Sequence, residues 1–233
     1  MRPRTAILIA VALVYIVGAY APFGHEILYP LTLFTTWVHE MGHGLSALIL
    51  GGSFKELEIF SNASGLAWCY AAPGWREAGV SLGGLLAPPI VGAAILASVH
   101  GPKRARIALA ILAGALVLSL VIWVRSVTGF IAMPIVAALL AWAAWRSWFG
   151  ESPERRVILA QVLGVVLALD TLTRMVSYVF MDTVDVGGQT RPTDISNVAS
   201  NLGGHYVLWG MVVTAVAVGL LGGALWWAWR RSE

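Results

Sequence analysis

Charged residues are scarce in this chain. Lys, Arg, Asp and Glu make up 12% of the 233 residues, whereas a soluble domain carries roughly 25%. Hydrophobic residues make up 58%, and the mean hydropathy is +0.79. This composition excludes an ordinary soluble domain and predicts an integral membrane protein surrounded by a lipid bilayer.

Cysteine is almost absent as well. Cys69 is the only one, which excludes an internal disulfide and any metal cluster built from cysteines. The net charge of +3 is small and comes from short basic clusters between apolar runs. Such clusters determine membrane orientation, so we expect no nucleic-acid partner.

Apolar runs follow one another along the chain and predict its membrane helices. They lie at about 5–20, 27–50, 78–100, 107–124, 130–148, 157–180 and 205–229. The expected fold class is an all-α polytopic membrane protein with about six to seven transmembrane helices, forming one domain over residues 1–233. The first run also resembles a cleavable secretory signal, but we favour an uncleaved span because many membrane segments follow.

The basic clusters constrain how the helices cross the membrane. By the positive-inside rule all of them should be cytoplasmic. They lie at the N-terminus, Lys103–Arg106, Arg146–Arg156 and Arg230–Arg231. Seven full crossings cannot place both chain ends on one side. We therefore expect about six crossings with one re-entrant region, or removal of the first segment.

Residues 53–70 break the helical pattern. Polar and apolar residues alternate from Phe54 to Phe60, turn residues follow at 61–65, and Leu66–Tyr70 forms a second short extended stretch. This pattern predicts a membrane-associated β-hairpin. A free edge of that hairpin could pair with an extended substrate.

One motif in the second apolar run carries recognisable chemistry. His39, Glu40 and His43 form an H-E-x-x-H pattern. On a helix, residues four apart share a face, so both histidines can hold one zinc ion (Zn²⁺), with Glu40 at the border as general base for a water molecule. Ionisable residues within a bilayer cost about 2.5–3.5 kcal/mol each, and they usually mark function. We expect a polar access path for water around Thr35, Thr36, His39 and Ser46.

Two other interpretations fit these residues. The histidines and Glu40 could serve, with Asp170 and Arg174, as an ion or proton path in a transporter-like bundle. Alternatively, the chain could be a metal-binding scaffold without catalytic activity.

A catalytic zinc ion needs a third protein ligand. The candidates are Asp170, Asp194, Asp182, Asp185, His205, His25 and His100. Asp170 lies deep in a span, but Arg174 is four residues away and predicts an ion pair. Asp194 follows Pro192 at a predicted helix start within the polar segment 181–204, where a carboxylate is often an N-cap. Spacing alone leaves these two aspartates near parity.

Several segments resemble the site-2-protease clan of intramembrane zinc metallopeptidases, most closely its small bacterial M50B-like group. The segments that carry the resemblance, in order, are Val38–Gly44, Gly51–Gly52, Ser64–Cys69, Ser81–Gly92, Trp123–Gly129 and Thr193–Ala199.

The resemblance implies an intramembrane zinc metalloprotease, multi-pass in a bacterial plasma membrane, that cleaves single-span membrane proteins. It implies zinc binding by His39 and His43, Glu40 as general base, and Asp194 as third ligand. Better-known members place that ligand in an Asn-Pro…Leu-Asp-Gly segment. Here Ala168-Leu169-Asp170-Thr171 lacks the glycine and the asparagine–proline partner, so Asp170 stays the alternative.

Overall fold

The computed structural model describes residues 3–145, 153–178 and 181–230, and its elements confirm the expected fold class. The chain is mostly helical, with two small antiparallel hairpins. The elements are α1 (Pro3–Tyr20), α2 (Gly24–Ile49), β1 (Ser53–Ile59), β2 (Gly65–Tyr70), α3 (Trp75–Ser98), α4 (Pro102–Ile122), α5 (Val127–Trp145), α6 (Pro153–Tyr178), β3 (Thr183–Val186), β4 (Gln189–Pro192), α7 (Asp194–Leu202) and α8 (Tyr206–Arg230).

Five helices of the described chain are long and apolar enough to cross a membrane, or six if α1 and α2 count as one broken span. α1 and α2 are bent by 113° at the break. Phe23, at the break, has φ 61°. Gly24 begins α2 directly against the carbonyl of Gly18, where a β-carbon would have no space. A glycine is therefore required for this sharp turn.

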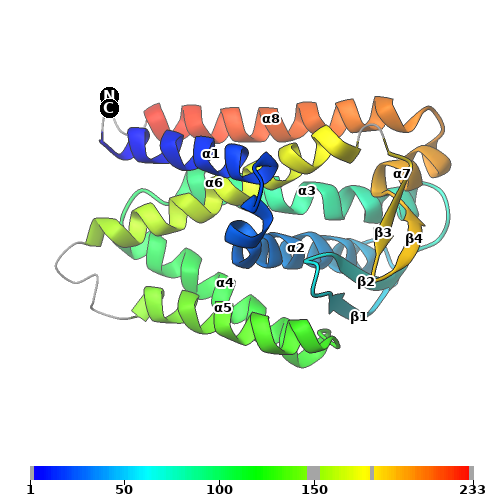
Figure 1. Cartoon of the computed structure of the whole chain (residues 1–233), viewed down its shortest axis with the longest axis horizontal. Coiled ribbons are helices and arrows are strands. Elements are labelled where there is room, and N and C mark those ends of the chain that lie inside the picture. Colours follow the sequence, from blue (N-terminus) through cyan, green and yellow to red (C-terminus); the bar gives the residue numbers. More distant parts are fainter. Residues whose placement is uncertain (1–2, 146–152, 179–180, 231–233) are drawn as a thin grey trace.

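Figure 1 shows how the helices run between two ends of the molecule. Both termini lie at one end, and the two hairpins and α7 lie at the other. α1 and α2 together therefore carry the chain from the first end to the second once. α3, α4, α5, α6 and α8 then alternate between the ends. This arrangement places both termini on one side, which seven independent crossings could not do.

Small residues bring α3 close to α2. A β-carbon on Gly42 would lie 2.5 Å from the carbonyl oxygen of Gly83, and one on Gly83 would collide with Ser46. Gly84 faces the ring of His43 in the same way. Gly83 and Gly84 of α3 thus permit close packing against the helix that carries the H-E-x-x-H motif.

The predicted hairpin forms as β1 and β2, with Leu57 opposite Ala67. On its other side, β1 meets the segment after α4: the Leu57 amide donates to the Trp123 carbonyl (2.8 Å), and the Arg125 amide donates to the Leu57 carbonyl (2.9 Å). The outer edge of β2 has no strand partner within the described part of the chain. β2 is therefore the free edge of this hairpin.

A second hairpin, β3–β4, was missed in the polar segment 181–204. Its strands pair over only four residues each, with Asp185 opposite Thr190. Gly187 and Gly188 form the turn with φ of 60° and 78°. Two consecutive residues with positive φ are typical of a tight hairpin turn, so the Gly-Gly pair was the available signal.

Candidate metal centre

The H-E-x-x-H motif lies on α2, as predicted, and its histidines face each other one turn apart. The two Nε2 atoms are 3.1 Å apart, and the ring centroids are 4.7 Å apart. Both side chains are largely buried.

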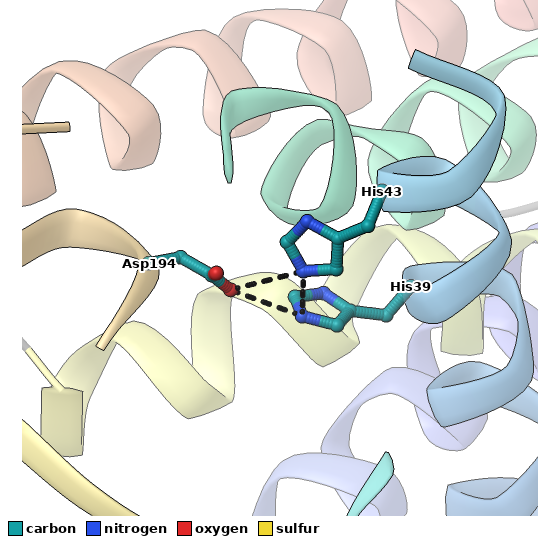
Figure 2. A group of neighbouring side chains, drawn as sticks. All are labelled: His39, His43 and Asp194. Carbon is teal, nitrogen blue, oxygen red and sulfur yellow. Dashed lines mark hydrogen bonds and ion pairs between the residues drawn. The ribbon is translucent and has the colours of Figure 1, made fainter. Parts of the chain in front are cut away.

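Asp194 approaches the two histidines from α7. Its Oδ2 atom lies 3.1 Å from His39 Nε2 and 3.3 Å from His43 Nε2, and Figure 2 shows the three side chains pointing toward one another. The N-cap role belongs to Thr193, whose side-chain oxygen accepts from the Ser196 amide at 3.3 Å. The carboxylate of Asp194 is therefore not needed as a cap.

These three donor atoms fit a zinc ion. Zinc–ligand distances of about 2.0–2.1 Å place neighbouring ligand atoms of a tetrahedral ion about 3.3–3.4 Å apart. The observed separations are 3.1, 3.1 and 3.3 Å. Two imidazoles and one carboxylate also match the donor set of catalytic zinc sites, which leave a fourth position open. Among the described residues, His39, His43 and Asp194 form a group whose donor atoms are close enough together to hold one metal ion.

A hydrogen bond orients the second histidine. His43 Nδ1 lies 2.9 Å from the carbonyl oxygen of Val80. Because a carbonyl only accepts, Nδ1 carries the proton and donates, which leaves the lone pair of Nε2 directed at the group. Partners of this kind fix the ring orientation of metal-binding histidines.

The charges around the group favour an ionised Asp194. Burial alone would raise the pKa of this carboxyl, but His43 and His39 more than offset burial and hold the pKa well below its usual range. Cys69 on β2 behaves in the opposite way. Burial, together with the negative charges of Glu40 and Asp194, raises the pKa of its thiol to about 11. The thiol is thus protonated at neutral pH, which disfavours it as a metal ligand or nucleophile.

Glu40 is buried beside the histidines, with an exposed fraction of 5%. Its carboxylate lies against Gly65, the first residue of β2: a β-carbon there would come within 2.7 Å of Glu40 Oε1. The absence of a side chain at position 65 therefore makes room for the carboxylate next to the free edge of β2.

Asp170, the alternative third ligand, has other partners. Arg174 Nε donates to Asp170 Oδ2 at 2.9 Å, which confirms the ion pair expected from the spacing. Tyr15 and Thr35 donate their hydroxyls to the other carboxylate oxygen, at 3.1 and 2.8 Å. Asp170 thus joins α1, α2 and α6 and is not part of the group formed by His39, His43 and Asp194.

The remaining candidate ligands lie elsewhere. Asp185 and Asp182 belong to the second hairpin or its approach, and Asp185 accepts from the Gly188 amide at 3.1 Å. His25 and His205 contact neighbouring tyrosines, and His100 follows α3 at the opposite end of the molecule. None of the five belongs to the metal-binding group in the described structure.

A cavity of about 390 Å³ leads to the group. Its walls come from the motif face of α2, from β2, from the start of α3, from α6, and from β3, β4 and α7. Of the four residues expected along the access path, His39 lines this cavity, whereas Thr35, Thr36 and Ser46 do not. The Thr35 and Thr36 hydroxyls donate instead to Asp170 and to the Ala63 carbonyl.

The fold and this site together define a polytopic membrane protein with a His/His/Asp group suited to a metal ion. The sequence profile of the family described as Peptidase M50B-like matches residues 5–224, nearly the whole chain. The chain therefore belongs to the Peptidase M50B-like family, which implies a metallopeptidase; the M50 peptidases are typically zinc-dependent. No curated protein and no solved structure matched the chain significantly.

Proposed function

We propose that this protein is an intramembrane zinc metalloprotease that hydrolyses peptide bonds of single-span membrane proteins, in a bacterial plasma membrane. The observation that carries the proposal is the convergence of His39, His43 and Asp194, whose donor atoms lie within 3.3 Å of each other. Family membership supports the same chemistry.

In this proposal His39 and His43 of α2, as neutral imidazoles, and Asp194 of α7, as a carboxylate, hold the zinc ion. When bound, zinc supplies Lewis acidity, which polarises a carbonyl and makes water a better nucleophile. The largely buried position of the three side chains strengthens these electrostatic effects, because charges interact more strongly away from water.

Glu40 moves the proton in the proposed reaction. As the water oxygen forms its bond to the scissile carbonyl carbon, the Glu40 carboxylate accepts the water proton. When the carbon–nitrogen bond breaks, Glu40 returns that proton to the departing amide nitrogen. The position of its carboxylate, beside Gly65 and within the cavity wall, supports this role.

The substrate would bind as an extended strand along β2. Residues of β2 line the cavity, and the outer edge of β2 is free in the described structure. β1 cannot offer the same edge, because the Trp123–Arg125 segment already hydrogen-bonds to Leu57. An unpaired edge offers main-chain hydrogen bonds to any unwound segment, which suits cleavage of a helix after local unfolding.

Cleavage of a single-span test protein by the purified full-length chain in liposomes tests the proposal. The probe carries glycine or proline residues within its span, so that it unwinds readily. We expect Glu40→Gln to retain zinc and to lower the cleavage rate by about 10²–10⁴-fold, because general acid–base catalysis contributes that much. Glu26→Gln, at an exposed glutamate of the same helix, is the matched control and should cleave normally.

The same preparation discriminates the two rival interpretations. A transporter-like bundle predicts purified protein without zinc, in which Glu40→Gln abolishes ion transport. An inactive scaffold predicts stoichiometric zinc and no cleavage of any unwound helix. Undiminished cleavage by the Glu40→Gln variant would contradict the role proposed for this residue.

A further inference from the structure

We propose that the candidate catalytic site opens on the extracytoplasmic face of the membrane, so that its substrates present the extracytoplasmic part of their span for cleavage. The substrate part of this inference rests on the proposed peptidase function. The orientation rests independently on where the fold places the basic residues and the cavity.

The fold gathers the basic residues at the end opposite the site. Arg4 lies in the first turn of α1, Lys103 in the first turn of α4, Arg155 in the first turn of α6, and Arg230 ends α8. These four helix ends, which are far apart in the sequence, lie at the end of the molecule that holds both termini (Figure 1). Arg104, Arg106 and Arg156 follow in the same helix turns.

The end with the hairpins has a different balance of charge. Its described basic residues include Arg76 in the first turn of α3, together with Lys55, Arg125 and Arg191 in the strands and connections, and acidic residues accompany them. The acidic residues are Glu56, Glu58, Glu77, Asp182 and Asp185. An excess of Lys and Arg in short loops determines orientation, whereas acidic residues contribute little. The basic helix ends therefore belong to the cytoplasm, and the hairpins face outward.

The cavity opens at the hairpin end. Its lining includes Glu77 at the start of α3, Asp185 and Arg191 of the second hairpin, and Asn197 of α7. α4 and α5 contribute no described residue to the lining, and α8 contributes none. The polar entrance therefore lies among the elements that the charge pattern places outside the cytoplasm.

The second hairpin stands over the first at this entrance. The guanidinium of Arg191 lies 5.4 Å from the ring centroid of Trp68 on β2. At the hairpin tip, a β-carbon on Gly187 would come within 2.7 Å of the Phe60 ring. A substrate strand that reaches β2 must therefore pass between two structures that both belong to the outward end.

This orientation defines the substrate class. A segment that unwinds at the outer half of its span can reach the free edge of β2 without crossing the bilayer. A segment exposed only in the cytoplasm would have to pass the length of the helix bundle. We therefore expect single-span proteins whose extracytoplasmic half-span contains helix-weakening residues to be cleaved.

Cysteine labelling of the full-length protein in spheroplasts tests the orientation. The native cysteine is first removed as Cys69→Ser. One variant then carries Thr190→Cys on the exposed part of β4, and its matched partner carries Ser98→Cys at the exposed end of α3. Both substitutions are small and keep every Lys and Arg. The probe is a membrane-impermeant maleimide, added before or after permeabilisation.

We expect the Thr190→Cys variant to react in intact spheroplasts and the Ser98→Cys variant to react only after permeabilisation. The reverse pattern would overturn the proposed orientation, and so would equal labelling of both variants in intact spheroplasts. Labelling requires neither zinc nor cleavage. A reversed pattern would therefore leave the peptidase proposal intact, and loss of the peptidase proposal would leave the labelling result unchanged.

Discussion

Gly84 shows how the absence of a side chain makes room for a histidine of the candidate metal centre. The imidazole of His43 lies where a β-carbon on Gly84 would be, and its Nδ1 reaches the carbonyl of Val80 one turn earlier on α3. The ring therefore packs directly against the α3 backbone. Its hydrogen bond directs Nε2 toward His39 and Asp194.

Gly84→Ala should consequently disturb zinc binding. The added methyl group must displace the His43 ring or separate α3 from α2, and either change moves Nε2 away from the other two donors. We expect zinc loss during dialysis against a mild chelator, measured by elemental analysis. Gly114→Ala on α4 is the matched control, because nothing lies within 4 Å of its β-carbon position. Equal zinc retention by both variants would contradict the packing role of Gly84.

Contacts between side chains could be predicted from the sequence where both residues lie on one helix. The pairing of His39 with His43, and of Asp170 with Arg174, follows from residues four apart on one face. The choice between Asp194 and Asp170 did not follow from spacing, because it depends on which distant elements meet. Thr193 occupies the N-cap position and leaves the neighbouring carboxylate free, and this one-residue difference lies below the precision of helix boundaries read from sequence.

At the scale of elements, the Asp170–Arg174 pair joins the helices that surround the site. Arg174 also donates from Nη2 to the Thr36 hydroxyl at 3.0 Å, and that hydroxyl donates to the Ala63 carbonyl in the β1–β2 turn at 2.8 Å. The network thus connects α6, α2 and the first hairpin. Thr36, which belongs to this network, lies one helical turn before Glu40. The network therefore helps to hold the helix that carries the H-E-x-x-H motif in place.

Asp170→Asn tests that structural role. Asparagine keeps the shape but removes the charge that neutralises Arg174, and breaking a buried ion pair costs about 3 kcal/mol or more. We expect a lower thermal unfolding temperature with one zinc ion retained per chain. Asp182→Asn, at an exposed carboxylate, should change stability by no more than about 0.5 kcal/mol. Unchanged stability of the Asp170→Asn variant would show that the pair contributes little.

The two hairpins differ in how far they could be predicted. Alternation over Phe54–Phe60 and a clear turn indicated the first, and the structure confirms β1 and β2 there. The second has four-residue strands, too short for an alternating pattern to stand out from a polar linker. The Gly187–Gly188 pair was the available sequence signal for the second hairpin, because two consecutive glycines favour a tight turn.

At the scale of the whole molecule, composition predicts the class of protein, and the basic clusters support the orientation proposed for the chain. The number of crossings could not be settled from hydropathy, because the pattern shows two separate apolar runs, at 5–20 and 27–50, and does not reveal the bend between them. The structure joins them at a bend of 113°, where Gly24 meets the Gly18 carbonyl. In Figure 1 the two helices follow each other from the end with the termini to the end with the hairpins. The basic ends of α1, α4, α6 and α8 then share one side.

The central claim, that His39, His43 and Asp194 hold a zinc ion, is tested most directly by the zinc content of the detergent-purified protein. The measurement compares the wild type with the Asp194→Ala and Asp170→Asn variants, each dialysed against a mild chelator. One zinc ion per chain in the wild type and in Asp170→Asn, with loss in Asp194→Ala, is the predicted result. Zinc retained by Asp194→Ala and lost from Asp170→Asn would contradict it.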